Sequence, residues 1–307
     1  MTSETGIPGP HFRAGFVAII GEPNVGKSTL LNALIGTKIS IVTNKPQTTR
    51  HKIVGIVTRE NAQIVFFDTP GILVPRYMLH EAMMKTVHAA ISDVDVVCLM
   101  VDAEKGERSP QDNNDRILEI ARSVKKSVYL LINKIDAVRK ESILPYIARV
   151  SGQYPFKEIF PISALEGDGT HELLDALAAE MPEHPQYYPS DMLSEQSERF
   201  FVGEIIREKI FEKFQEEIPY STTVDILEFR EGEGKKDLIR AEIYVGRASQ
   251  KGILVGKQGS ALKAVGIQAR RDIEEFLGRK VFLELYVKVR ENWREDESWL
   301  KRLGYTR

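Results

Sequence analysis

The motif GEPNVGKS at residues 21–28 restricts the fold of this chain more than any other feature of its sequence. It fits the pattern G-x-x-x-x-G-K-[ST], and it follows the apolar run 16–20, which reads as a strand. A strand, loop and helix of this kind let backbone N–H groups point at phosphate oxygens, with Lys27 reaching the β- and γ-phosphates and the Ser28 hydroxyl ligating Mg²⁺. An ordinary glycine-bearing turn is the alternative, but it needs no Lys-Ser pair at a helix start. We therefore predict a nucleoside triphosphate site formed by Gly21, Glu22, Pro23, Asn24, Val25, Gly26, Lys27 and Ser28.

The pattern of apolar runs divides the 307 residues into two domains. In residues 15–180, runs rich in Val, Ile and Phe alternate with helical stretches, which predicts an α/β domain with a mostly parallel sheet covered on both faces. Three prolines then mark residues 181–196 as a linker, because proline continues neither a helix nor a central strand. Residues 1–14 are expected to be an N-terminal tail. The expected strands include 16–20, 64–67, 94–101 and 128–132, and the expected helices include 111–123 and 171–180.

Residues 197–307 show a different order of expected helices and strands, which predicts a smaller α+β domain. The expected order is helix, strand, strand, helix, helix, strand. A turn-like stretch at 231–237 joins the first two strands, and GKQG at 256–259 joins the last two helices. The expected elements span residues 197–215, 222–229, 238–245, 249–255, 260–277 and 281–289.

Composition excludes several classes of protein. With 42% hydrophobic and 28% charged residues, the chain has enough apolar side chains for packed cores and is not expected to be disordered. Its single cysteine, Cys98, excludes an intramolecular disulfide, fits a reducing compartment and lies in an apolar run typical of a core. No apolar run is long enough for a membrane span, and the first residues do not resemble a secretory signal. We therefore expect a cytoplasmic protein.

A second phosphate element is DTPG at residues 68–71, directly after the apolar run 64–67. Asp68 can hold Mg²⁺ through a water, and the Gly71 N–H can contact a γ-phosphate. Alone the motif is a weak signal, because turns often contain Asp, Pro and Gly. Its position after a buried strand strengthens it, and we predict that Asp68, Thr69, Pro70 and Gly71 line the same site.

The motif NKID at residues 133–136 predicts the base. Guanine presents N1–H and N2–H₂ side by side, and the Asp136 carboxylate can accept from both. Adenine has no such pair of donors, so Asp136 would stay desolvated and unpaired, which makes the discrimination strong. ISA at residues 162–164 would offer a backbone N–H to guanine O6. A helix-start Asn and a surface Asp are the alternative; the predicted base-binding residues are Asn133, Lys134, Asp136, Ser163 and Ala164.

In this order, GEPNVGKS, QTTRH, DTPG, NKID and ISA resemble the five motifs of the translation-factor-related GTPases, with the Era family the nearer match. The resemblance continues through SERFFVGEIIREKIF, GILVGKQGSALKAVG and VKVRENWREDESWL, so it covers nearly the whole chain from residue 15 onward. It implies a Ras-like, P-loop GTPase domain followed by a type II KH domain at residues 197–307. It also implies Mg²⁺-dependent hydrolysis of GTP to GDP, binding of small-subunit ribosomal RNA near its 3′ end, and assistance to assembly of the small ribosomal subunit. We expect a monomer. The resemblance also implies peripheral contact with the inner membrane.

The same resemblance assigns a switch and the metal ligands. QTTRH matches the switch segment, that is Gln47, Thr48, Thr49, Arg50 and His51. The implied Mg²⁺ ligands are Ser28, Thr49 and Asp68, with Thr48 as the rival of Thr49. A plain solvated loop is the alternative for residues 36–52.

One position departs from Ras-type enzymes and affects the expected mechanism. Ile72 follows DTPG where those enzymes carry a water-orienting Gln, and isoleucine cannot hydrogen-bond to water. Related GTPases with an apolar residue there often carry an Asn in the phosphate loop that helps to hold K⁺. Asn24 has that position in this chain. A monovalent cation beside the β–γ bridge would neutralise developing charge as an arginine finger does; the alternative is that Asn24 only shapes the loop.

GKQG at residues 256–259 predicts an RNA contact. It joins two helices in the order in which a KH loop clamps the backbone of about four nucleotides. From residue 243 to 271 there are six basic residues and no acidic one, which gives a local field in a neutral domain. The apolar residues 253–255 are expected to floor a groove for bases, and a glycine turn with solvated lysines is the alternative. The predicted RNA-binding residues are Gly256, Lys257, Gln258, Gly259, Lys251 and Lys263.

Two other functions remain open from the residues. One is a small-molecule phosphotransferase with residues 197–307 as its substrate domain; NKID argues against it, because such kinases rarely read guanine strictly. The other is a nucleotide switch that acts on proteins or at a membrane, where the basic stretch would meet anionic lipid. Binding to RNA oligonucleotides and to anionic vesicles separates these readings.

Overall fold

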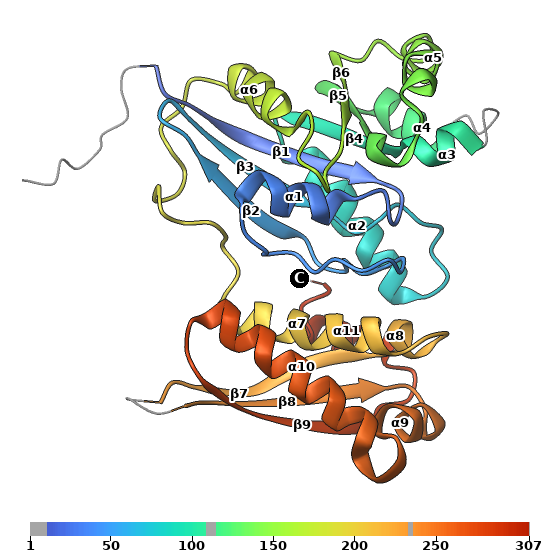
Figure 1. Ribbon diagram of the computed structural model, residues 1–307, viewed down its shortest axis with the longest axis vertical. Helices are drawn as coiled ribbons and strands as arrows, with labels where there is room; N and C mark the ends of the chain where they lie inside the picture. Colours follow the sequence, from blue (N-terminus) through green and yellow to red (C-terminus); the bar gives the residue numbers. More distant parts are fainter. Residues whose placement is uncertain (1–10, 109–114, 233–235, 307) are drawn as a thin grey trace, which may run out of the picture. The chain divides into compact units, whose positions relative to one another are not determined.

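The structure is a computed structural model that describes residues 11–108, 115–232 and 236–306 (Figure 1). The chain forms two compact units. Unit 1 comprises the chain up to Ser40, then Thr49–Leu73 and Met84–Glu195; unit 2 comprises Ile41–Thr48, Val74–Met83 and the chain from Gln196 onward. Parts of three sequence predictions lie outside the described residues: most of the tail 1–14, the start of the helix 111–123, and the middle of the turn 231–237.

Unit 1 contains a six-stranded sheet in the order β2-β3-β1-β4-β5-β6. All neighbouring strands pair in parallel except β2, which is antiparallel to β3. Every residue of β3 and β4 is buried, as expected for strands covered on both faces. The strands are β1 (Arg13–Gly21), β2 (Ile53–Thr58), β3 (Ala62–Asp68), β4 (Val96–Asp102), β5 (Ser127–Asn133) and β6 (Glu158–Ile162).

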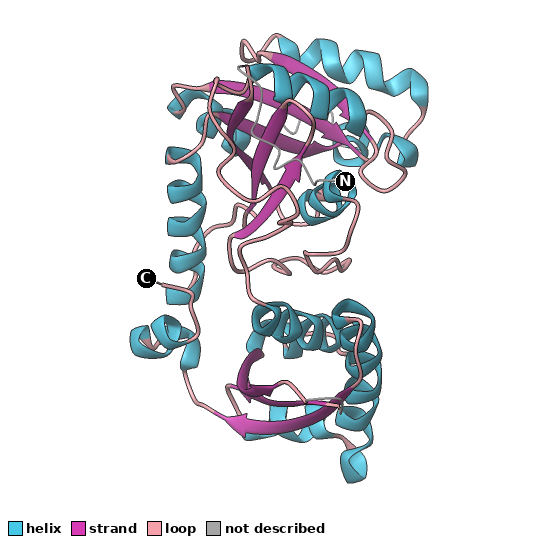
Figure 2. Ribbon diagram, turned by 90° about the vertical axis from the view of Figure 1, so that its left-hand side faces the viewer, coloured by secondary structure: helices cyan, strands magenta, loops and turns pink. Residues whose placement is uncertain are grey.

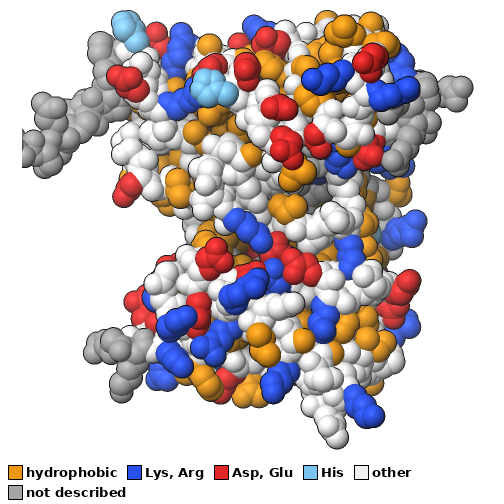
Figure 3. All heavy atoms as spheres, viewed as in Figure 1, with side chains coloured by type: hydrophobic (Ala, Val, Ile, Leu, Met, Phe, Trp, Pro, Cys, Tyr) orange, Lys and Arg blue, Asp and Glu red, His pale blue; other side chains and the backbone are white. Residues whose placement is uncertain are grey.

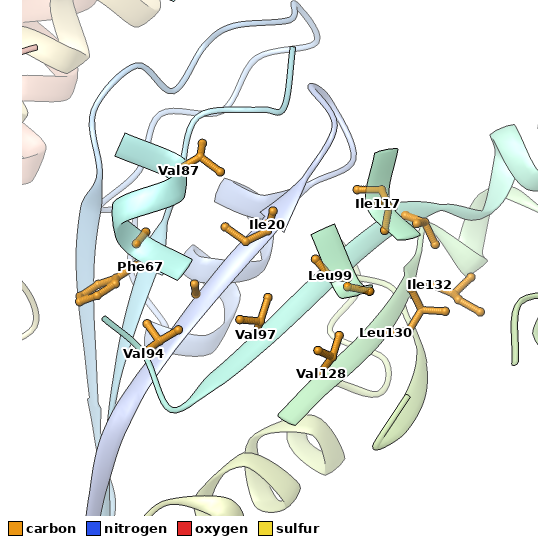
Figure 4. Close-up of a cluster of buried hydrophobic side chains, with 14 of the residues drawn as sticks. Ile20, Phe67, Val87, Val94, Val97, Leu99, Ile117, Val128, Leu130 and Ile132 are labelled. Atoms are coloured by element: carbon orange, nitrogen blue, oxygen red, sulfur yellow. The ribbon is translucent and has the colours of Figure 1, made fainter. Parts of the chain in front are cut away.

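Helices cover both faces of this sheet. On one face, α1 (Lys27–Ile35) and α6 (Thr170–Glu180) contact each other and the strands. The other face forms the larger core, where side chains of β1, β3, β4 and β5 meet those of α2 and α4 (Figure 4). The prediction of a mostly parallel sheet within an α/β domain is confirmed. The remaining elements of the region are α2 (Met78–Ser92), α3 (Ala103–Arg108), α4 (Asp115–Ser123), η1 (Ile135–Ala137) and α5 (Lys140–Ser151).

The polar motifs stand at the carboxyl ends of the parallel strands. Gly21 at the end of β1 pairs with Met100, Asp102 at the end of β4 pairs with Asn133, and Asn133 pairs with Ile162. Ligands of open α/β sheets bind outside this edge, where loops from neighbouring strands converge. The fold therefore gathers the phosphate loop, NKID and ISA at one place.

Unit 2 contains a three-stranded sheet in the order β7-β8-β9, with β7 antiparallel and β9 parallel to β8 (Figure 2). The side chains of α7 and α10 pack on it in a single apolar core. The predicted order of helices and strands is confirmed, and Ser197 caps α7 by accepting a hydrogen bond from the Phe200 N–H. The elements are α7 (Glu198–Lys213), α8 (Ile218–Ser221), β7 (Thr223–Arg230), β8 (Asp237–Val245), α9 (Ala248–Val255), η2 (Lys257–Gly259), α10 (Ser260–Leu277), β9 (Val281–Val289), η3 (Trp293–Glu295) and α11 (Glu297–Arg302).

The end of the chain closes back on the start of β7. Trp293 is buried, and its indole N–H donates to the carbonyl oxygen of Ser221 at 2.9 Å. The hydroxyl groups of Tyr305 and Thr223 lie 3.0 Å apart. Over the residues that the structure describes, no helix combines the length and the apolar composition that a membrane crossing needs.

Candidate functional site

The phosphate motif forms the turn between β1 and α1. Gly26 ends this turn with a φ of 102°, in the left-handed region that glycine adopts without strain. Lys27 begins α1, and its ammonium group donates to the carbonyl oxygens of Gly21 and Glu22 at 3.1 and 2.9 Å. Burial lowers the pKa of Lys27 to about 8, although Asp68 and Glu22 act in the opposite direction. The lysine therefore lies over the loop, near the helix N–H groups that suit a phosphate.

Asn133 joins three of the predicted motifs. Its Nδ2 donates to the carbonyl oxygen of Val25 at 2.7 Å, and its Oδ1 accepts from the Ala164 N–H at 2.9 Å. The side chain is only 2% exposed. A Cβ on Gly26 would lie 2.2 Å from Asn133 Nδ2, so the two residues are packed without room for a larger side chain. One buried amide thus holds the phosphate loop, NKID and ISA together.

Asp68 stands at the end of β3 with hydroxyl groups around it. Its Oδ2 accepts from Ser28 at 2.6 Å and from Ser40 at 2.9 Å, and the Thr49 hydroxyl lies 2.8 Å from that of Ser28. Its Oδ1 is buried and has no hydrogen-bond partner within the described parts of the chain. Burial raises the pKa of the Asp68 carboxyl, opposed mainly by the charge of Lys27. An unpartnered carboxylate oxygen beside hydroxyl groups fits a cation that prefers oxygen ligands, such as Mg²⁺.

Ser40 is a residue of this cluster that the sequence analysis missed. It is 1% exposed and lies in the segment for which a solvated loop was the alternative. The Asn32 side chain fixes it, because its Oδ1 accepts from the Ile39 and Ser40 N–H groups at 3.0 and 2.8 Å and its Nδ2 donates to the Ser40 carbonyl oxygen at 2.8 Å. Only the folded chain brings this hydroxyl to Asp68, so no spacing in the sequence could have identified it.

Thr49 and Thr48 differ in what their hydroxyl groups contact. Thr49 Oγ1 lies beside Ser28, as described above, whereas Thr48 Oγ1 donates to the Lys45 carbonyl oxygen at 2.7 Å and lies 2.7 Å from Thr43 Oγ1. The Thr48 hydroxyl is therefore used within its own loop. This arrangement favours Thr49 as the metal ligand of the two.

The remaining residues of QTTRH are Gln47, Arg50 and His51. Gln47 belongs to unit 2, has a φ of 60° and lies with its Oε1 3.1 Å from His80 Nε2. Arg50 is buried and His51 is half-buried in unit 1. Of the two threonines in the predicted switch, Thr49 has the hydroxyl group that lies beside Ser28.

DTPG packs directly against the phosphate loop. All four of its residues are buried. A Cβ on Gly71 would lie 2.7 Å from the Pro23 nitrogen, and the next residue, Ile72, donates its N–H to the Gly21 carbonyl oxygen at 3.0 Å. The Thr69 hydroxyl donates to the backbone of β1 at 2.9 Å. The glycine at residue 71 is therefore required by close approach of two backbones.

The NKID loop carries an exposed carboxylate in a fixed orientation. Ser163 is buried and donates to Asp136 Oδ1 at 2.5 Å, while its hydroxyl accepts from the Glu166 N–H at 3.1 Å. Lys134 has a φ of 67°, and its ammonium group lies 2.7 Å from Oδ2 of Asp102. Asp102 is a second residue that the sequence analysis missed, since it carries no motif of its own.

GKQG forms the predicted turn between α9 and α10. Gly256 and Gly259 have φ values of 72° and 77°, and Gln258 has a φ of 52°. A Cβ on Gly256 would lie 2.6 Å from that of Ala261, so the turn requires glycine there. The side chains of Lys257 and Gln258 are exposed at the tip. The loop therefore offers backbone, amide and ammonium groups to an anionic ligand.

An open groove of about 400 Å³ runs from this loop between α10 and β9. Basic and hydrophobic side chains lie close together on the face that carries α10 (Figure 3). The expectation that residues 253–255 floor the groove is wrong, because Leu254 is buried in the core and none of the three residues lines the groove. Lys251 also lies exposed on α9, outside the groove lining. The lining residues are Gly259, Leu262, Lys263, Gly266, Ile267, Arg270, Leu283 and Leu285.

Family models match both halves of the chain. Residues 16–134 match the 50S ribosome-binding GTPase family, and residues 217–294 match the KH domain family. GTPase Era of Geobacter metallireducens is 48% identical over 296 residues, which cover 96% of this chain and 98% of that protein. GTPase Era of Lacticaseibacillus paracasei is 49% identical over 292 residues, covering 95% of this chain and 96% of that protein.

Solved structures agree over both units. A crystal structure of Era with MgGDPNP and nucleotides 1506–1542 of 16S ribosomal RNA has a TM-score of 0.92 and 38% identity, covering 97% of this chain and 100% of that one. A variant of Aquifex aeolicus Era bound to GDP and AlF4⁻ also has a TM-score of 0.92 and 38% identity, covering 96% of this chain and 100% of that one. The Ras-like and KH folds implied by the motifs are confirmed. The chain belongs to the GTPase Era family.

Proposed function

We propose that this GTPase reads guanine through Asp136, hydrolyses GTP with Mg²⁺ and K⁺ at the sheet edge, and binds the 3′ end of small-subunit ribosomal RNA through the groove beside GKQG. The nucleotide part of the proposal is supported above all by two hydrogen bonds of buried Asn133, which donates to the Val25 carbonyl oxygen and accepts from the Ala164 N–H. They bring a phosphate loop and a base loop into one site, which neither motif achieves alone. By binding that RNA, the chain would assist assembly of the small ribosomal subunit in the cytoplasm as a monomer.

Base reading is tested by Asp136→Asn. The change replaces one acceptor oxygen by a donor that faces another donor on guanine, while Ser163 keeps a hydroxyl in place. GTP affinity should fall by about two orders of magnitude, roughly 3 kcal/mol. Xanthosine triphosphate, which offers a carbonyl at that position, should bind the variant better than GTP does. Equal binding of GTP and ATP by the unchanged protein would refute the assignment.

The Mg²⁺ ligands proposed here are the hydroxyl groups of Ser28 and Thr49, with Asp68 holding the ion through a water. Bound Mg²⁺ would neutralise charge on the β- and γ-phosphates during transfer. Support comes from the three oxygen-bearing side chains that lie together and from the unpartnered Asp68 Oδ1 within the described residues. Thr49→Ala should weaken MgGTP binding much more than GDP binding in EDTA, as measured by nucleotide titration. Equal losses in the two titrations would count against a metal role.

The proposed K⁺ residue is Asn24, which is exposed in the phosphate loop with a φ of 65°. K⁺ bound there would add positive charge near the β–γ bridge. Ile72, which stands where Ras-type enzymes carry a water-orienting Gln, cannot hydrogen-bond to water. Unaided hydrolysis should be slow, on the order of 10⁻⁴ to 10⁻² s⁻¹, and faster in K⁺ than in Na⁺ at equal ionic strength. Asn24→Ala should remove most of that difference and leave GDP affinity unchanged. Identical rates of the unchanged protein in the two salts would refute the role.

The RNA part rests on the groove and on the composition of its lining. Lys263 and Arg270 face phosphates from one side, and Leu262, Leu283 and Leu285 offer an apolar floor to unstacked bases. The similar Era structure with nucleotides 1506–1542 of 16S ribosomal RNA supports the choice of ligand. Lys251, predicted as an RNA contact, would meet only the flank of such a ligand, since it lies outside the lining.

The test is a double variant, Lys257→Asp with Gln258→Asp, which adds negative charge at the tip and keeps both glycines. Single-stranded RNA from the 3′ end should bind at least tenfold more weakly, and the log–log salt slope, about −2 to −3 for three or four phosphate contacts, should become shallower. Lys213→Asp with Gln215→Asp is the matched control, because both residues are exposed and the charge change is the same. Basal GTP hydrolysis should survive in both. Unchanged RNA binding by the first variant would refute the KH assignment.

Peripheral contact with the inner membrane is the second proposal, and it rests on the same basic residues meeting anionic lipid. Vesicles with and without anionic lipid, added to the RNA titration as competitors, decide between the two ligands. Displacement of RNA only by anionic vesicles would support a shared surface, and no displacement would remove the membrane proposal. Turnover of a small phosphate acceptor would instead support a phosphotransferase.

A further inference from the structure

The residue that closes β4 has two separate hydrogen-bond tasks. Asp102 is 7% exposed and pairs in register with Asn133 on β5. Its Oδ2 lies 2.7 Å from the ammonium group of Lys134, and its Oδ1 accepts from the Glu104 N–H at 2.9 Å. The first contact is to the NKID loop, and the second starts α3. No nucleotide motif includes this aspartate.

Each polar side chain of the NKID loop forms a hydrogen bond with a residue outside that loop. Asn133 binds Val25 and Ala164, Asp136 binds Ser163, and Lys134 binds Asp102. A lysine side chain is flexible and strongly hydrated, so without a fixed partner it samples many rotamers. A charge-assisted hydrogen bond to a nearly buried carboxylate selects one of them. The Lys134 side chain is 32% exposed, so one side of the lysine remains available to a ligand.

We propose that Asp102 is a positioning residue for the guanine base. It holds Lys134 so that the aliphatic part of the lysine side chain covers the flat face of the base, while Asp136 binds the edge of the base. The proposal rests on the base-reading role given to NKID above. Fixing a side chain before the ligand arrives lowers the entropy lost on binding, so the effect appears as slower nucleotide release. Asp102 itself does not touch the base in this proposal.

A nearby ion pair provides a control in the same segment. Lys105 of α3 lies 2.7 Å from Glu22 Oε2 in the phosphate loop, with the two side chains 53% and 40% exposed. Exposed pairs contribute little, because solvent screens them and two long side chains must be ordered. Lys105→Met therefore removes a charge contact near the site without touching Lys134, and nucleotide release should stay within twofold of the parent.

The test is Asp102→Asn in the full chain. Asparagine keeps an acceptor at Oδ1 for the Glu104 N–H, so α3 still starts correctly, but it presents an NH₂ group to the Lys134 ammonium. The dissociation rate of mant-GDP should rise at least tenfold. Mant-IDP, which lacks the 2-amino group that Asp136 reads, should be released faster by the same factor, because the lysine covers the base whatever its exocyclic groups. Asp136→Asn should instead change GDP and IDP unequally.

A double-mutant cycle separates positioning from support of the fold. Lys134→Met keeps the stem but removes the ammonium, and it should by itself raise the mant-GDP dissociation rate as Asp102→Asn does. Adding Asp102→Asn to Lys134→Met should change the rate by less than twofold. A tenfold effect that persists in the Lys134→Met background, or a Lys134→Met rate equal to the parent rate, overturns the proposal. The Lys134→Met rate can be measured even if the Asp102 variant does not fold, so the proposal can still be refuted.

Failure of this inference is distinguishable from failure of the proposed function. If the parent releases mant-GDP and mant-ADP at the same rate, base reading by NKID is wrong and the inference falls with it. If the parent holds GDP selectively and Asp102→Asn releases it at the parent rate, only the role of Asp102 is wrong.

Discussion

Of the glycines in the phosphate loop and DTPG, Gly26 leaves the least room for a side chain, because Asn133 lies beside it, and Gly26→Ala tests whether the proposed nucleotide site depends on this contact. The added methyl group would lie 2.2 Å from Asn133 Nδ2, and the residue would keep a φ of 102°. The left-handed backbone costs a non-glycine residue about 1–2 kcal/mol. If Asn133 moves away, its two hydrogen bonds are lost, at about 1 kcal/mol each.

These contributions give an expected loss of about 3–4 kcal/mol in the free energy of unfolding. A folded variant relaxes by displacing Asn133, and nucleotide binding must then restore its contacts with Val25 and Ala164. Restoring them against the methyl group should cost about 2–3 kcal/mol, which raises the Kd for GDP roughly 30- to 150-fold. Titration with mant-GDP measures the Kd, and urea unfolding measures the stability.

Gly36→Ala is the matched control. Gly36 has a φ of 78° at the end of α1, and nothing lies within 4 Å of the position that a Cβ would take there. The control therefore carries the same kind of backbone strain, about 1–2 kcal/mol, without the collision. Its Kd for GDP should equal that of the parent. The reasoning is refuted if Gly26→Ala binds mant-GDP as the parent does, or if Gly36→Ala weakens binding equally.

Three further outcomes are expected. Phosphate binding should raise the pKa of Lys27 from its lowered value of about 8, so GDP affinity should fall as the pH rises above about 8, and calorimetry in buffers of different ionisation heat should detect proton uptake there. Burial raises the pKa of the Cys98 thiol, so iodoacetamide followed by mass spectrometry should label it in urea but not in the native chain. Trp293→Phe should lower stability to urea by about 2 kcal/mol by leaving the buried Ser221 carbonyl oxygen without its donor, whereas Trp299→Phe, on a half-buried side chain, should cost less.

The elements predicted correctly are those whose apolar pattern is continuous in the sequence. The runs at 16–20 and 64–67 fall within β1 and β3, and α10 and β9 have the bounds predicted for them. Each of these elements is continuous in sequence and buried in a regular pattern. The phosphate loop, DTPG, NKID and ISA were predictable for the same reason, because each stands at the end of a strand, whereas QTTRH lies in a loop before β2 and was assigned only by resemblance.

β2 was not among the strands predicted from sequence, and Gly55 explains why. A glycine interrupts the apolar run IVGIVT and weakens its strand signal. In the fold a Cβ there would lie 2.4 Å from Ile35 Cδ1 and 2.6 Å from Leu31 Cδ1, so glycine is needed where α1 packs on the strand. That contact joins segments far enough apart in the chain that composition cannot indicate it.

Contacts that arise only on folding also account for the missed site residues. Ser40 reaches Asp68 across 28 positions, and Asp102 reaches Lys134 across 32. Ser40 stands in a loop and Asp102 at the end of β4, and neither is part of a sequence motif. The floor of the groove was misplaced for a related reason: Leu254 turns into the core, and the lining comes from α10 and β9.

The two hydrogen bonds of Asn133 have a consequence for fragments of the nucleotide. In the proposed site, guanosine would occupy only the base end and pyrophosphate only the phosphate end, yet the phosphate loop and the ISA loop are both hydrogen-bonded to the Asn133 amide. A fragment that orders Asn133 therefore orders the empty end as well. Each fragment should bind more tightly in the presence of the other, and by the same factor in both directions, because such coupling is reciprocal. The two halves of a guanine nucleotide would thus be thermodynamically linked through the protein even when no bond joins them.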